Sequence, residues 1–313
     1  MPIFQQLLNE LAKLPPDQQA GYVNSFRADQ IRQIAALTGR GLLVYAADFK
    51  KTLPPQFGMT NSITWEDKTC FADLVDGLGT RQVDVLVHSP GGSVEATESL
   101  VALLRANFDD VRFFVPNMAK SAATMLALSG NQLLMDDRSE LGPIDPQILI
   151  NGMYVPAQTV IDGFDEAKQR IKTGGPDVLP AYLPLLSKYD LHVLQICENA
   201  KVLSRRLVAG WLAEYMFKAK PRRKQVAGKL AKILADHKRY LSHARGIRIA
   251  EAKELGLDVL DLRDRGELRD KVWSLYCVIE LLFDRTPIMK LYESSKGVLL
   301  LKQIPVMPTQ PHN

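Results

Sequence analysis

The sequence predicts an α/β protein built around a parallel sheet. Short apolar strands alternate with amphipathic helices through short connections, in the order strand 83–89, helix 94–107, strand 111–116, helix 119–130 and strand 131–136. This alternation is typical of βαβ units. A chain of 313 residues, 46% hydrophobic and 24% charged, has the balance of a globular protein with a substantial core.

The flanking segments divide the chain further. Helices broken by a Pro-Pro pair precede a strand at 41–49, and long amphipathic helices interrupt the strand-helix pattern later on. Helix, glycine and strand return at 250–262, and a short strand ends the pattern. We therefore expect an N-terminal helical segment (1–40), an α/β core (41–175), a helical arm (176–245), the C-terminal part of the core (246–303) and a disordered tail (304–313).

Composition argues against export, membrane insertion and metal binding. The N-terminus lacks a cationic start followed by an apolar stretch, and no run approaches the roughly 18 apolar residues of a membrane span. Cys70, Cys197 and Cys277 are widely spaced without a Cys-x-x-Cys pair, which predicts reduced core cysteines in a cytoplasmic protein.

Two motifs follow neighbouring predicted strands. The first is Pro-Gly-Gly-Ser at 90–93, where Gly91 and Gly92 permit a turn whose amides can face an anion or a developing oxyanion. The second is Ser121, at the start of the next predicted helix. Either motif alone has an ordinary explanation, as a plain turn or as a helix cap. Together, at the carboxyl ends of adjacent strands, they supply the nucleophile and the oxyanion donors that acyl transfer requires.

The blocks HSPGGSVEATESLVALLRA and VRFFVPNMAKSAATMLALSGNQLLMDDRSELGPIDPQ resemble the Clp-protease/crotonase superfamily, and most closely the serine dehydrogenase proteinase family, relatives of signal-peptide peptidase A. The likeness covers residues 60–150 closely and 237–262 more loosely. It implies a Clp/crotonase-like spiral of βαβ units, with added N-terminal helices and a helical insertion. The family usually has glycine where this chain has Ala123, and often an apolar residue in place of Lys120.

The resemblance implies a role for each motif. Ser121 falls on the nucleophile of the family and Gly91 and Gly92 on its oxyanion turn, with the amide of Ala122 as a second donor. Clp proteases take a base from a histidine one βα unit later, where GPIDPQ here offers Asp145 and no histidine.

The general base therefore has three candidates. Signal-peptide peptidase relatives use a downstream lysine, which points to Lys168 or Lys172, and His243 lies near the origin of the third member of the Clp triad. Each also has a structural interpretation, as solvated helix lysines and as a helix-end histidine.

We expect a cytoplasmic serine endopeptidase that needs no metal or organic cofactor. Peptides or unfolded proteins would be its substrates, since no ATPase P-loop is present. Two alternatives stay open: crotonase-type chemistry on an acyl-coenzyme A, with Glu95 or Glu140 as acid or base, and a non-catalytic scaffold that lacks the base.

The charge distribution bears on partners. The net charge is only +4, but residues 218–248 hold eleven Lys and Arg against Asp236 alone. Few aromatic residues accompany them, so nucleic acid is not the expected partner. We expect a solvated face or an acidic partner at this arm, and homo-oligomers as the resemblance implies.

Overall fold

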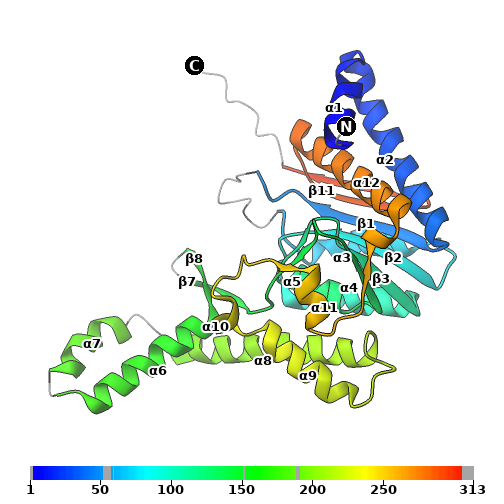
Figure 1. Cartoon of the computed structure of the whole chain (residues 1–313). Helices are drawn as coiled ribbons and strands as arrows, with labels where there is room; N and C mark the ends of the chain where they lie inside the picture. The colour runs from blue at the N-terminus through cyan, green and yellow to red at the C-terminus, as the bar shows by residue number, and fades with distance from the viewer. Residues whose placement is uncertain are drawn as a thin grey trace, which may run out of the picture. The chain divides into compact units, whose positions relative to one another are not determined.

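The computed structural model describes residues 3–51, 58, 60–150, 152–175, 177–187 and 191–304. The chain forms two compact units (Figure 1). Unit 1 comprises residues 1–141 and 247–313, and unit 2 comprises residues 142–246. The predicted α/β class is confirmed by unit 1.

The main sheet of unit 1 has the order β10-β5-β3-β2-β1-β11-β12 among the described residues. Strands β10, β5, β3, β2 and β1 run parallel, and β11 and β12 add an antiparallel hairpin at the β1 edge. Their bounds are β1 Gly41–Ala47, β2 Gln82–His88, β3 Asp110–Phe114, β5 Gln132–Met135, β10 Val259–Asp261, β11 Ile288–Ser294 and β12 Leu299–Gln303.

Helices cover both faces of this sheet, as Figure 1 shows for the group α1, α2 and α12. Alternate residues of a strand point to opposite faces, so Leu42, Val44 and Ala46 of β1 join the core beneath α1, α2 and α12. The helices of unit 1 are α1 Ile3–Ala12, α2 Pro16–Thr38, α3 Glu66–Val75, α4 Val94–Asn107, α5 Ala122–Leu128, α11 Ile249–Glu254 and α12 Gly266–Arg285, with a 3-10 turn at Leu262–Asp264.

The N-terminal helices begin and end where the sequence predicts a break. Pro16 occupies the first turn of α2, where its missing N–H costs nothing, and Gly39 ends the helix in the left-handed conformation at φ 65°.

The three cysteines are free, with Cys197 and Cys277 buried and Cys70 partly buried.

A small sheet, β4-β6-β9, stands beside the carboxyl ends of the main strands in unit 1. Its strands are β4 Met118–Ala119, β6 Glu140–Leu141 and β9 Ile247–Arg248. Strand β4 is parallel to β6, and β9 is antiparallel to β6.

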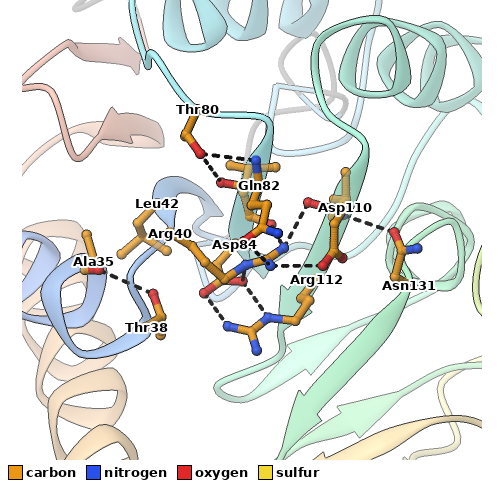
Figure 2. A network of polar contacts seen from close by, with 12 residues as sticks. Ala35, Thr38, Arg40, Leu42, Thr80, Gln82, Asp84, Asp110, Arg112 and Asn131 are labelled. Atoms are coloured by element: carbon orange, nitrogen blue, oxygen red, sulfur yellow. Dashed lines mark hydrogen bonds and ion pairs between the residues drawn. The ribbon is translucent and has the colours of Figure 1, made fainter.

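A charged network ties the amino ends of β1, β2 and β3 together (Figure 2). Asp84 of β2 is fully buried and accepts hydrogen bonds from Arg40 Nε at 2.8 Å and from Arg112 Nε and Nη2, both at 2.8 Å. Arg40 also reaches Asp110 Oδ2 at 2.9 Å. Two guanidinium groups thus share one buried carboxylate at the strand ends.

Removing that carboxylate is expected to destabilise unit 1. Asp84→Ala would leave two guanidinium groups without their shared partner, so we expect the free energy of unfolding to fall by about 3–5 kcal/mol. Chemical denaturation measures this loss. Asp109→Ala is the matched control, because its pair with Arg81 is exposed and should contribute little. Equal losses for the two variants would contradict a structural role for the network.

Unit 2 consists of a hairpin and helices. The hairpin pairs β7 Gln147–Ile150 with β8 Met153–Pro156. Helix α6 packs on β8, α7 and α8, and α8 packs on α9. The helices are α6 Ala157–Thr173, α7 Val178–Leu186, α8 Leu191–Glu214, α9 Arg223–Leu234 and α10 His237–Tyr240.

Unit 2 begins at Gly142, whereas the predicted arm begins at residue 176. Residues 147–156 pair with each other rather than with the main sheet, and α6 buries Val160 and Ala157 against Cys197 of α8. The predicted tail lies outside the described residues beyond Ile304. Within the described part of the chain, no helix combines the length and the apolar character needed to cross a membrane.

Candidate active site

Ser121 stands between β4 and α5 in a backbone conformation that side chains rarely adopt. Its φ is 51° and its ψ is −121°. Such a conformation costs on the order of 1–3 kcal/mol for a residue with a Cβ and is concentrated at functional sites. The hydroxyl does not cap α5, and we find no hydrogen bond from it to another described residue. The helix-cap interpretation is therefore wrong, and the serine is displayed on a strained turn.

The glycine turn (residues 90–93) packs directly against this serine. Gly91 has φ 100°, and a Cβ built on it would lie 2.6 Å from Lys120 O, 2.8 Å from Ser121 Cβ and 2.9 Å from Ala122 N. Real Cβ atoms essentially never come so close to other atoms. Glycine is required here because its missing side chain lets two backbone segments touch. The structure thus brings together Gly91, Ser121 and Ala122.

Strand pairing explains why these two segments meet. Beyond the end of β2, Ser89 forms an isolated parallel bridge with Ala119. Its amide donates to Met118 O at 3.1 Å, and its carbonyl accepts from Lys120 N at 3.0 Å. The glycine turn follows Ser89, and Ser121 follows Lys120. Both segments therefore begin where this strand pairing ends.

Two amides near Ser121 remain available to a ligand. The Gly91 amide donates to Ser89 Oγ at 3.2 Å. By contrast, the amides of Gly92 and Ala122 donate no hydrogen bond to any residue that the structure describes. A pair of unoccupied backbone donors beside a serine is the arrangement that stabilises an oxyanion.

Lys120 is held away from base chemistry. Its Nζ lies 2.9 Å from Glu140 Oε2 and 3.3 Å from Leu141 O. The Lys120 ammonium group lowers the pKa of Glu140 below its ordinary value; burial opposes this effect, and Arg248 adds to it.

Glu95 is exposed in the first turn of α4 and accepts from Ser93 Oγ at 2.9 Å. Because Glu140 is ionised and paired, the acid/base pair suggested for crotonase chemistry has little support here.

Unit 2 pairs two histidines with one buried carboxylate. Asp145 is 2% exposed. Its Oδ1 lies 2.8 Å from His243 Nδ1, and its Oδ2 lies 3.2 Å from His237 Nδ1. A carboxylate at Nδ1 fixes the tautomer of a histidine and leaves Nε2 as the basic nitrogen. His243 thus has the oriented partner that a general base requires.

The two predicted lysines differ from His243 in this respect. Lys168 and Lys172 both lie on α6 with exposed side chains, and neither forms an ion pair with an acid among the described residues. Their surroundings fit the interpretation as solvated helix residues.

Sequence reasoning missed Asp145 as the partner of His243. Asp145 drew attention only as the residue that GPIDPQ offers where Clp proteases have a histidine. Its pairing with His243 was hidden because the two residues are 98 positions apart in the chain. It also gave no hint of Asp67, a buried carboxylate behind the glycine turn, because the segment TWEDKT resembles an ordinary helix start.

A match to a protein family covers the glycine turn and Ser121. The model of the family of ClpP-like, SDH-type serine proteinases matches residues 77–174. The predicted family resemblance is therefore confirmed over this stretch, which contains the glycine turn and Ser121 and ends before His243.

Two uncharacterized proteins of Methanocaldococcus jannaschii are similar in sequence. One is 30% identical over 182 residues, covering 57% of this chain and 54% of the relative. The other is 24% identical over 140 residues, covering 42% and 47%. The chain spans about half the length of the curated relatives it matches.

Two solved structures are similar in part. Both are variants of a membrane-bound stomatin-specific protease, 1510-N. A serine-to-alanine variant matches with a TM-score of 0.41 at 15% identity, over 67% of this chain and 79% of that chain. A lysine-to-alanine variant in complex with a substrate peptide matches with a TM-score of 0.39 at 15% identity, over 67% and 75%.

Proposed function

We propose that this protein is a serine endopeptidase that forms an acyl-enzyme on Ser121. The observation that carries the proposal is the strained Ser121 turn packed against Gly91. Beside it, the amides of Gly92 and Ala122 donate no hydrogen bond to a described residue. The match of residues 77–174 to a serine proteinase family supports the same chemistry.

The proposed reaction has two stages, formation of the acyl-enzyme and its hydrolysis. Ser121 Oγ attacks the peptide carbonyl carbon and gives its proton to a base, while the carbonyl oxygen becomes an oxyanion held by the two amides. The proton then passes to the leaving amine as the C–N bond breaks, which leaves an ester on Ser121. Water, deprotonated by the same base, hydrolyses the ester and restores the hydroxyl.

For the base we propose His243, oriented by Asp145. Among the three predicted candidates it is the one whose position is fixed by a buried carboxylate, whereas Lys168 and Lys172 are exposed on α6.

Substrate and partners follow from the same proposal. Peptides or unfolded chains are the expected substrates, in the cytoplasm, with the protein working as a homo-oligomer. An acidic partner would fit a surface hollow of about 650 Å³ in unit 2. Gln225 and five cations line it: Lys218, Lys220, Arg222, Arg223 and Lys224.

A peptidase assay with an unfolded, fluorescently labelled protein tests the proposal. Ser121→Ala is expected to lower kcat by at least about 1,000-fold, since loss of a nucleophile removes the covalent route. Ser274→Ala is the matched control, because that hydroxyl donates to Asp270 O in its own helix. Equal turnover by the wild type and Ser121→Ala would exclude Ser121 as the nucleophile.

A further inference from the structure

A buried polar cluster lies behind the glycine turn and takes no direct part in the proposed reaction. At its centre is Asp67, fully buried in the first turn of α3. Lys290 of β11, 1% exposed, donates to both of its oxygens at 2.8 and 3.1 Å, and the Tyr292 hydroxyl donates to Oδ1. A buried ion pair of this kind is costly to desolvate, so its presence beside a candidate site calls for an explanation.

The first connection from Asp67 to the turn runs through the backbone. Asp67 Oδ2 accepts from the Thr64 amide at 2.7 Å, and the Asp67 amide donates to Thr64 O at 3.1 Å. Residue 63, directly before, clamps the turn on both sides: Ile63 N donates to Gly91 O at 2.7 Å, and Ser93 N donates to Ile63 O at 2.9 Å. Asp67 therefore holds in place the Ile63–Thr64 segment, which is hydrogen-bonded to the glycine turn.

This clamp sets the direction of the Gly92 amide. The structure has no cis peptide bonds among its described residues, and in a trans peptide the C=O and the N–H point in opposite directions. Because Gly91 O faces Ile63, the N–H of Gly92 in the same peptide faces away from it. A Cβ on Gly92 would lie 2.3 Å from Ile63 O and 2.4 Å from Ile63 N, so the contact needs glycine.

The second connection runs through side chains. The Tyr45 hydroxyl donates to Asp67 Oδ2 at 3.4 Å. Burial and the charge of Asp67 raise the pKa of Tyr45, and the neighbouring Ser89 opposes this rise. Ser89 Oγ in turn accepts the Gly91 amide at 3.2 Å. Asp67 thus holds the Tyr45 hydroxyl, and the neighbouring Ser89 holds the other peptide of the turn.

We propose that Asp67 is a positioning residue that locks the Gly91–Gly92 peptide with its N–H toward the substrate carbonyl at Ser121. Two adjacent glycines have little steric barrier to a different backbone conformation. Without the lock, the peptide would rotate and present the Gly91 carbonyl oxygen where the oxyanion forms. The proposal rests on the proposed function, since it gives the locked amide its role.

The test removes both members of the buried pair at once. The double variant Asp67→Ala/Lys290→Met leaves no unpaired buried charge but frees the Thr64 amide. We expect kcat on peptides and the rate of Ser121 labelling by a fluorophosphonate to fall at least about 10-fold, toward the 100–1,000-fold loss of an oxyanion donor. KM should change by less than about 3-fold, because a transition-state contact alone is lost.

The matched control is Arg27→Met/Glu293→Leu, which removes another buried ion pair that includes a β11 residue and is not connected to the turn. If this control lowers kcat as much as the Asp67 double variant does, the positioning role is excluded. Should the Asp67 double variant not fold, Tyr45→Phe decides: slower labelling than in the wild type supports the positioning role of Asp67, and an unchanged rate overturns it.

A crystal structure of the Asp67 double variant separates this proposal from the peptidase proposal. A rotated or multiply oriented Gly91–Gly92 peptide supports the lock, and an unchanged peptide overturns it, whether or not the wild type cleaves peptides. Absence of labelling and turnover in the wild type would instead exclude the proposed function.

Discussion

Replacing Gly91 with alanine is expected to lower kcat/KM on peptides by at least about 100-fold, the scale of a lost oxyanion donor. The added methyl would overlap Lys120 O, Ser121 Cβ and Ala122 N, all within 2.9 Å, at a φ of 100°. The turn and the serine must therefore separate. Steady-state kinetics on a fluorogenic peptide, with circular dichroism as a check of folding, measure the effect.

Gly77→Ala provides the control for backbone strain alone. Gly77 has a φ of 70°, in the left-handed region, but a Cβ there would meet nothing within 4 Å. It should lose about 1–2 kcal/mol of stability and keep its turnover. A Gly91→Ala variant as active as Gly77→Ala would show that the close approach of the turn to Ser121 has no catalytic role.

Replacing His243 with alanine is expected to lower kcat by about 100–10,000-fold, the usual contribution of a general base. Asp145→Asn should act in the same direction, because an amide no longer stabilises the protonated imidazole. His237→Ala should lose much less, since the His243–Asp145 pair at 2.8 Å stays in place. The wild type and these three variants can be compared by the rate of product release from an ester substrate in a single turnover.

The lysine variants distinguish the remaining candidates. Lys168→Ala and Lys172→Ala are expected to retain turnover, because both side chains are exposed. An inactive Lys172→Ala or Lys168→Ala beside an active His243→Ala would contradict the assignment of the base and favour a Ser-Lys mechanism.

The parts of the fold that local pattern determines were predictable. Alternating strands and helices gave the parallel part of the sheet, because apolar runs and helical periodicity are encoded within each segment. The pairing of the glycine turn with Ser121 was predictable too, because carboxyl ends of parallel strands meet at one edge.

Long-range pairing was not predictable in the same way. Strand β11 is buried along its whole length yet carries Lys290 and Glu293, which obscure the apolar pattern. These charges are tolerated because their partners come from distant segments: Asp67 lies 223 positions from Lys290, and Arg27 lies 266 positions from Glu293. Single-sequence patterns hold no record of such partners, and the same reason hid the pair of His243 with Asp145.

Covalent labelling tests the central claim most directly. The full-length wild type would be incubated with a fluorophosphonate and its modified residue located by peptide mass mapping. A single adduct on Ser121, absent from Ser121→Ala, is the predicted result. An unmodified Ser121, or an adduct on a different serine that persists in Ser121→Ala, would contradict it.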